Sequence, residues 1–308
     1  MPTKVLLAAP RGYCAGVERA VEAVERALQT HGAPVFVRKQ IVHNAHVVRD
    51  LESKGAVFVD EETEVPEGAV VVLSAHGVAP EVHQKAVARR LTVLDATCPL
   101  VTKVHLEARR FATKDRTIVL IGHAGHEEVV GTTGQAPDRT VLVQDVAEAR
   151  SLRVVDPDNL AYLTQTTLSV DETNEIVEAL RDRFPSIEGP PREDICYATQ
   201  NRQDAVKELA RRADVVLVIG SDNSSNSKRL AEVAREQGTP AHLVDDETEV
   251  DPAWLDGADV VGITSGASAP EWLVDRMLSW LASRGAKEVE ELRLTEEHVR
   301  FSDVRVDR

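Results

Sequence analysis

Three cysteines, Cys14, Cys98 and Cys196, are the residues of this sequence best suited to bind a metal. Each one follows an apolar, strand-like stretch and opens a segment whose apolar residues recur at helical spacing. A thiol at the start of a helix is readily deprotonated, because the partial positive charge of the backbone amides stabilises the thiolate. A single cysteine would be interpreted as a small buried hydrophobic residue. Three cysteines in equivalent positions favour a metal site instead.

Zinc and an iron–sulfur cluster are the two metal groups that three thiolates suggest. Structural zinc normally takes four protein ligands, two of them in a C-x2–4-C pair, and this sequence has no such pair. A cuboidal iron–sulfur cluster accepts widely separated cysteines, and three of them leave one iron without a protein ligand. Such an iron is a Lewis acid that can accept a substrate oxygen. Because the C-x3-C-x2-C spacing of radical S-adenosylmethionine enzymes is also absent, we expect a cluster with a substrate-binding iron.

A second group of polar residues follows the strand-like runs of the sequence. Each histidine, taken alone, could be an ordinary structural residue, and the SDNSSNS stretch could be a solvated loop. Hydroxyl, amide and imidazole groups beside helix N-termini are nevertheless well suited to bind phosphate, and Lys and Arg are scarce among these residues. We therefore expect a small anionic ligand in a cavity lined by His43, His76, one of His123 and His126, Glu128, Thr166, Ser224, Ser225, Asn226 and Ser268.

The elements that position these residues repeat three times along the chain. Each repeat has the order strand, cysteine, helix, followed by further strands that end in polar residues. His43, His123 and Ser221 lie 29, 25 and 25 residues after their cysteines, and His76, Thr166 and Ser268 lie 62, 68 and 72 residues after them. Strands that alternate with helices predict an α/β fold with parallel sheets. We expect three αβα sandwich domains related by a pseudo-threefold axis.

The repeats predict the domain boundaries as residues 1–96, 97–193 and 194–283, each with one cysteine, and a charged C-terminal tail, 284–308, that wraps back over the body. Open α/β sheets bind ligands at the carboxyl ends of their strands. If these ends face a common axis, the three thiolates meet at one point.

Composition excludes several other classes of function. The chain has 51 acidic and 36 basic side chains, and its net charge of −15 opposes binding to nucleic acids and to anionic membranes. The longest apolar runs are too short to span a membrane. An odd number of dispersed cysteines is typical of a reducing compartment. We expect a cytoplasmic protein.

The motifs taken together identify a family resemblance that extends from about residue 5 to residue 280. The sequence is similar to the 4-hydroxy-3-methylbut-2-enyl diphosphate reductase family, which catalyses the last step of the non-mevalonate isoprenoid pathway. The matching motifs are PRGYCAGVERAV, QIVHN, SAHGV, DATCPLV, GHEEVVGTTGQ, TQTTLSVDET, DICYATQNRQ, GSDNSSNSKRL and TSGASAPEWLV. The resemblance implies three αβα domains around a central 4Fe–4S cluster with one open iron.

The resemblance also implies a role for each matching residue. Cys14, Cys98 and Cys196 match the cluster ligands, Thr166 matches a hydroxyl near the substrate alcohol, and Glu128 matches the carboxylate that delivers protons. The diphosphate-binding positions are His43, His76, His126, Ser224, Ser225, Asn226 and Ser268. The family motif GHxGHPE reads GHAGHEE here, so that Glu127 replaces a proline.

The reaction implied is a reductive dehydroxylation that yields isopentenyl and dimethylallyl diphosphate. No G-x-G-x-x-G follows a predicted strand, so the electrons are expected from a separate donor such as ferredoxin or flavodoxin. Two alternatives share the three thiolates: a quinolinate-synthase-like iron–sulfur dehydratase and a non-catalytic metal-binding sensor. The Ser-Ser-Asn loop argues against the first, and a sensor would not need Glu128 and Thr166.

Overall fold

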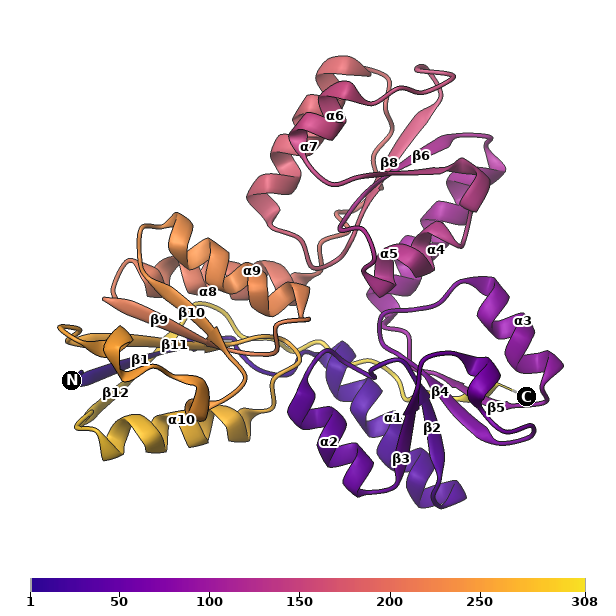
Figure 1. Cartoon of the computed structure of the whole chain (residues 1–308). Coiled ribbons are helices and arrows are strands. Elements are labelled where there is room, and N and C mark those ends of the chain that lie inside the picture. The colour runs from indigo at the N-terminus through magenta and orange to yellow at the C-terminus, as the bar shows by residue number, and fades with distance from the viewer. Residues whose placement is uncertain (1, 308) are drawn as a thin grey trace. The chain divides into compact units, whose positions relative to one another are not determined.

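The structure is a computed structural model that describes residues 2–307, and its elements are labelled in Figure 1. The chain divides into two compact units. The first unit combines the residues up to Glu18 with Val42–Asp50 and Tyr197–Arg300. The second combines Arg19–Ile41, Leu51–Cys196 and the residues from Phe301 on. Both units are α/β structures built on parallel sheets, as the sequence predicts.

The first unit contains one five-stranded parallel sheet, which we call the β1 sheet. Its order is β10-β9-β11-β1-β12. The strands are β1 (Lys4–Ala9), β9 (Val215–Ile219), β10 (Ala241–Val244), β11 (Val260–Ser265) and β12 (Glu288–Arg293). Both faces are buried: Val5 and Leu7 pack into one apolar cluster, and Leu6 and Ala8 into the opposite one. Helices α8 (Tyr197–Ala210) and α9 (Ser225–Glu236) cover one face, and α10 (Glu271–Ser283) covers the other (Figure 1).

The second unit contains two sheets, the β4 sheet and the β6 sheet. The β4 sheet has the order β13-β5-β4-β2-β3, in which only the pairing of β13 is antiparallel, and the β6 sheet has the order β7-β6-β8. Their strands are β2 (Val35–Arg38), β3 (Ala56–Val59), β4 (Val70–Leu73), β5 (Thr92–Asp95), β13 (Val306–Asp307), β6 (Thr117–Ile121), β7 (Thr140–Val143) and β8 (Leu160–Thr164).

The remaining helices connect these strands, and their ends follow local sequence signals. Gly32, with φ +76°, ends α1 because it accepts the left-handed conformation that stops a helix. Pro99 occupies the first turn of α4, where its missing N–H costs no hydrogen bond. The helices are α1 (Ala15–His31), α2 (Ala45–Ser53), α3 (Pro80–Ala88), α4 (Pro99–Thr113), α5 (Glu127–Thr133), α6 (Val146–Ser151) and α7 (Val170–Arg183). Between residues 2 and 307, no helix has the length and apolarity needed to cross a membrane.

The strand pairings correct two expectations from the sequence. The strand before Cys14, β1, was expected in the sheet of the first repeat but pairs with β11 and β12. The segment before Cys196 was expected to be a strand, and in the described chain it forms only an isolated bridge between Ala161 and Glu188. The tail predicted over residues 284–308 contains two strands, β12 and β13, which pair with β1 and β5. Hydrophobic periodicity identifies a strand but does not determine which sheet it joins.

These pairings share a pattern: each sheet is completed by the segment that leads to the next cysteine. The strand before Cys98, β5, pairs with β4, and the strand before Cys14, β1, pairs with β11. The segment before Cys196 bridges to β8. The first repeat therefore contributes to two sheets, with β1 in one and β2 to β5 in the other, and the domain boundaries at residues 96 and 193 remain a sequence-based prediction.

Candidate active site

The three cysteines have the same backbone environment. Each directly precedes a helix, and its N–H donates to a carbonyl two residues beyond the end of a parallel strand. Cys14 donates to Ala267 at 3.3 Å, Cys98 to Ala75 at 3.0 Å, and Cys196 to Thr166 at 3.0 Å. The acceptors follow β11, β4 and β8. This repeated hydrogen bond holds each thiol at the carboxyl end of a sheet.

The chemistry of these thiols fits an iron–sulfur group. Among the described residues none of the three forms a disulfide bond; all are partly exposed, and each opens a helix, where a thiolate is favoured. Cys14 belongs to the first unit, and Cys98 and Cys196 belong to the second. Within either unit, the described residues bring no three His, Cys, Asp or Glu side chains together as a metal site. The meeting of the three sulfurs stays a prediction.

In the second unit, Glu128 and Thr166 form a buried carboxyl–hydroxyl pair. Glu128 lies in the first turn of α5 and is 2% exposed, and Thr166 follows β8. The Thr166 N–H donates to Glu128 Oε1 at 2.6 Å, and Thr166 Oγ1 lies 3.0 Å from Glu128 Oε2. The backbone carbonyl of Thr166 also accepts the N–H of Cys196. Thr166 therefore links Glu128 to one of the three cysteines.

Burial raises the pKa of Glu128 to about 7, although its hydrogen bonds from Thr166 act in the opposite direction. The nearby negative charge of Asp194 adds to the increase in pKa. A carboxyl group with this pKa is partly protonated at neutral pH and can release its proton, which is what a general acid requires. Thr166 Oγ1 is the group next in line to receive that proton.

Two histidines lie beside this pair. His126 is the N-cap of α5, and its Nδ1 accepts the N–H of Glu128 at 3.2 Å. A neutral imidazole that accepts at Nδ1 carries its proton on Nε2, where it is a donor. The ring of His126 meets that of His76 edge to face, with centroids 5.9 Å apart. His76 directly follows Ala75, the acceptor of the Cys98 N–H, so a continuous path of contacts joins Cys98 to Cys196.

The first unit brings the remaining predicted residues together around Cys14. Ser268 Oγ donates to the carbonyl of His43 at 2.9 Å, and the N–H of Ala267 donates to Asn226 Oδ1 at 2.9 Å. Ala267 also accepts the N–H of Cys14. Burial lowers the pKa of His43 to about 4, so that its ring is neutral at pH 7.

Asn226 carries the clearest sign of a ligand in this unit. Its Nδ2 is buried and has no hydrogen-bond partner among the described residues, and an orphaned buried donor is costly unless a ligand satisfies it. Ser224 is the N-cap of α9, and its oxygen accepts the N–H of Ser227 at 3.2 Å. Ser225 is the first residue of that helix and is partly exposed. These groups surround a helix N-terminus, where anions bind favourably.

Sequence reasoning missed two residues near Glu128. Gln165 is 1% exposed; its Oε1 accepts the N–H of His123 at 3.1 Å, and its Nε2 donates to Thr167 Oγ1 at 2.8 Å. Thr167 is the strict counterpart of His76 and Ser268, because each of the three follows the acceptor of a cysteine N–H. Aligning the repeats on the strand ends rather than on polar residues would have found it.

The fold and the site together define a class of protein. It is an α/β protein that carries cysteines, imidazoles, hydroxyls and a carboxyl group at the carboxyl ends of parallel strands. This arrangement suits an enzyme that acts on a small anionic substrate. Residues 5–282 match the model of the LytB protein family. The chain belongs to this family.

Two curated relatives carry the same name. A 4-hydroxy-3-methylbut-2-enyl diphosphate reductase from Acidothermus cellulolyticus is 62% identical over 300 residues, which cover 97% of this chain and 88% of that protein. One from Mycolicibacterium paratuberculosis is also 62% identical, covering 97% of this chain and 90% of the relative. The solved structure of E-1-hydroxy-2-methyl-but-2-enyl-4-diphosphate reductase from Plasmodium falciparum superposes with a TM-score of 0.95 at 36% identity, covering 99% of this chain and 96% of that one.

Proposed function

We propose that this chain is a 4-hydroxy-3-methylbut-2-enyl diphosphate reductase. It converts (E)-4-hydroxy-3-methylbut-2-enyl diphosphate, two electrons and two protons into water and either isopentenyl or dimethylallyl diphosphate. The observation that carries the proposal is the Glu128–Thr166 pair, because loss of a hydroxyl group as water requires a proton donor. The name shared by relatives at 58–62% identity supports the same reaction.

The three cysteines, Cys14, Cys98 and Cys196, hold a 4Fe–4S cluster in this proposal. Such a cluster, when bound, supplies electrons one at a time and leaves one iron open as a Lewis acid toward the substrate hydroxyl. Partly exposed thiols at helix starts are the donor set that this group needs. The proposal gives these three cysteines no other role.

The diphosphate is held by His43, His76, His126, Ser224, Ser225, Asn226 and Ser268. Imidazole groups, hydroxyl groups and the amide of Asn226 can donate hydrogen bonds to the diphosphate, and helix N-termini add a favourable potential. Binding energy from this remote group fixes the alcohol beside Thr166. Binding of the substrate also excludes water from the reacting carbon.

Proton delivery begins at Glu128 Oε2. Because Thr166 Oγ1 lies 3.0 Å away, it can accept that proton and pass its own hydroxyl proton to the departing oxygen of the substrate. A second proton completes the product at either end of the allyl group, which accounts for two isomers. An external one-electron donor of the ferredoxin or flavodoxin class supplies the electrons, and three cysteines without a disulfide bond among the described residues suit the cytoplasm.

The test is metal analysis and turnover of protein purified without oxygen. Iron and sulfide should be present, and a chemically reduced sample should convert the alcohol to both isopentenyl and dimethylallyl diphosphate, measured by mass spectrometry. Replacing any one cysteine by serine should lower the iron content. Zinc without iron would contradict the proposal, and so would conversion of a different substrate by dehydration alone.

A further inference from the structure

A basic residue follows each cysteine by one and a half helical turns. Arg19, Lys103 and Arg202 come five, five and six residues after Cys14, Cys98 and Cys196. They lie on α1, α4 and α8, the helices that the cysteines open. In each case the side chain reaches the carbonyls of the turn that leads to a different cysteine.

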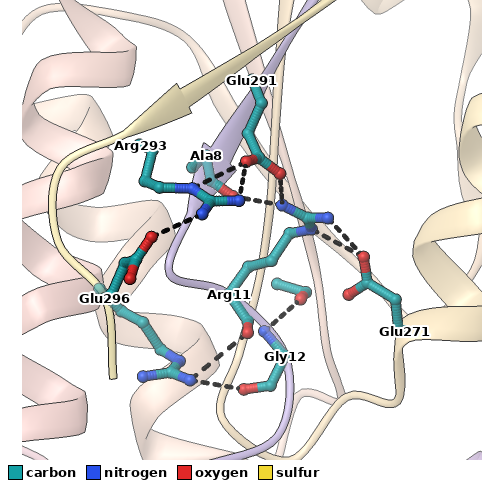
Figure 2. Close-up of polar contacts among 9 residues, drawn as sticks. Ala8, Arg11, Gly12, Glu271, Glu291, Arg293 and Glu296 are labelled. Carbon is teal, nitrogen blue, oxygen red and sulfur yellow. Dashed lines mark hydrogen bonds and ion pairs between the residues drawn. The ribbon is translucent and has the colours of Figure 1, made fainter. Parts of the chain in front are cut away.

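Arg202 shows the contact most completely. Its side chain is fully buried, and Nη2 donates to the carbonyl of Gly12 at 2.8 Å and to that of Arg11 at 3.4 Å. Figure 2 shows these two carbonyls receiving hydrogen bonds. Glu297 balances the charge, with Oε1 3.0 Å from Arg202 Nη1. Arg202, which follows Cys196, thus holds the turn before Cys14.

Arg11 is part of the turn before Cys14 and fixes it through its own side chain. Arg11 Nε donates to Glu271 at 3.0 Å, and Nη1 donates to Glu291 at 3.2 Å and to the carbonyl of Ala8 at 3.0 Å (Figure 2). Glu291 belongs to β12, so this strand takes part in positioning the Cys14 turn.

Lys103 makes the equivalent contact in the second unit. Its Nζ donates to the carbonyls of Arg192 and Glu193, both at 2.7 Å, and lies 3.1 Å from Asp194 Oδ1. These three residues lead directly to Cys196. Asp194 is itself buried, and its Oδ2 accepts the N–H of Thr164 at the end of β8. Lys103, which follows Cys98, thus holds the turn before Cys196.

Arg19 completes the set. Its Nη1 donates to the carbonyl of Thr97 at 3.0 Å, and Thr97 directly precedes Cys98. Its Nε donates to the carbonyl of Ser302 at 2.8 Å. The three contacts form a closed sequence: the helix of each cysteine holds the turn of the next one.

We propose that Arg19, Lys103 and Arg202 are positioning residues that act as cyclic clamps on the cysteine turns. The proposal rests on the proposed function in that the turns are taken to present cluster ligands. Hydrogen bonds from a cation to backbone carbonyls are stronger than neutral ones. They restrict the ψ angles of the turn that leads to each cysteine. A metal site requires its ligands within a few tenths of an ångström, which favours such rigid support.

The first test follows amide hydrogen exchange in the metal-free protein. The variants are R19M, K103M and R202M, in which methionine keeps an unbranched apolar side chain. Exchange of the Cys98, Cys196 and Cys14 amides, respectively, should accelerate by about tenfold, because a lost charged hydrogen bond destabilises the closed turn by that order. R202M should have the largest effect, since Arg202 is the most buried of the three.

The control variants are R109M on α4 and R211M just after α8, because both side chains are exposed. They should leave the exchange of all three cysteine amides unchanged. If R202M does not fold, R202K, K103M and R19M still decide the outcome, because R202K keeps the charge and the other two side chains are partly exposed. R19K, K103R and R202K should restore slow exchange in part.

The second test measures how long iron is retained. After anaerobic reconstitution, the clamp variants should lose the visible absorbance of the cluster to a chelator several times faster than R109M does. Faster exchange at the variant's own cysteine, or uniformly along the chain, would overturn the proposal, and so would unchanged iron retention in variants whose turns are loosened. Absence of iron in the unmodified protein would contradict the proposed function instead, while the exchange data would still judge the clamps.

Discussion

Glu128 combines two properties that are rarely found together in one carboxyl group: complete burial and a hydrogen bond to a hydroxyl group that can relay a proton. Asp and Glu side chains are seldom fully buried unless they are paired or functional. No basic side chain forms an ion pair with Glu128 among the contacts of the described residues. The proton is therefore held by desolvation, which is a device of general acids.

Turnover should depend on pH through this group. The pKa of Glu128 is raised to about 7, so the acid is protonated below pH 7 and the rate should fall as pH rises through that value. E128Q cannot donate a proton, and kcat should fall about a hundredfold or more while iron and substrate binding persist. The measurement is a single-turnover rate against pH with the cluster reduced in advance.

Glu127 provides the matched control for this prediction. It is the neighbouring carboxyl group, and burial also raises its pKa, but the hydrogen bonds from Thr166 go to Glu128. E127Q should keep both the rate and its decline above pH 7. An unchanged decline in E128Q would show that another group is responsible.

Asn226 tests the anion site separately from the chemistry. In N226D the Oδ1 acceptor for the Ala267 N–H is preserved, but the orphaned donor becomes a carboxylate oxygen that repels a diphosphate. Calorimetry with inorganic diphosphate should show affinity weakened about tenfold or more, with iron content unchanged. Q237E, at the other end of α9, adds the same charge and should bind normally. Equal affinities in N226D and the unmodified protein would exclude Asn226 from the site.

At this scale the sequence predicts residue types but not partners. Cysteines, histidines and hydroxyls at strand ends can be recognised from spacing, and the Glu128–Thr166 contact agrees with the roles implied by the family resemblance. The link from Asn226 to Ala267 and the clamp from Arg202 to Gly12 join segments far apart in the chain. Only tertiary packing, which short-range periodicity does not contain, brings such segments together.

Among the elements, α5 matters most, because it carries His126 and Glu128 at its start. Two glycines let it approach the turn after β4 closely. A Cβ on Gly131 would meet the carbonyl oxygen of Gly77 at 3.0 Å, and one on Gly134 would meet the Cβ of Ala79 at 2.3 Å. The position of Glu128 relative to Thr166 therefore depends on the absence of two methyl groups.

G134A should displace α5 and destabilise the fold by about 1–3 kcal/mol, the usual cost of overpacking. The rate should fall as well, because Glu128 moves with the helix. A79G removes the clashing methyl group, and glycine is favoured over alanine at an N-cap such as position 79, so A79G alone should be close to neutral. The double variant G134A/A79G should recover most of the stability in urea denaturation. No recovery would mean that the clash lies elsewhere.

Element boundaries were largely predictable from local signals, whereas sheet membership was not. Gly32 marks the end of α1 and Pro99 the start of α4 in the sequence itself. The pairing of β1 with β11 and β12 depends on tertiary packing, so the periodicity of the sequence predicts this strand but not the sheet that it joins. The sequence likewise predicts a strand before Cys196, where the described chain has only an isolated bridge.

For the whole molecule, the exchange of strands between repeats means that the chain should not separate into independent thirds. Residues 197–300 expressed alone lack β1, which lies between β11 and β12. We expect this fragment to aggregate or to lack protected amides in β12, and a peptide of residues 1–18 added in trans should restore protection. The same peptide with Val5 and Leu7 changed to Asp should not. Cooperative unfolding of the fragment alone would contradict this interpretation.

The central place of β1 also has a consequence for how the chain is made. Residues 4–9 are synthesised before both strands that flank them in the sheet, because those strands lie after residue 259. Val5, Leu6 and Leu7 therefore stay uncovered until β11 and β12 have also been synthesised. Since exposed apolar segments of an unfinished chain are prone to aggregate, this nascent segment is one that chaperones are suited to shield.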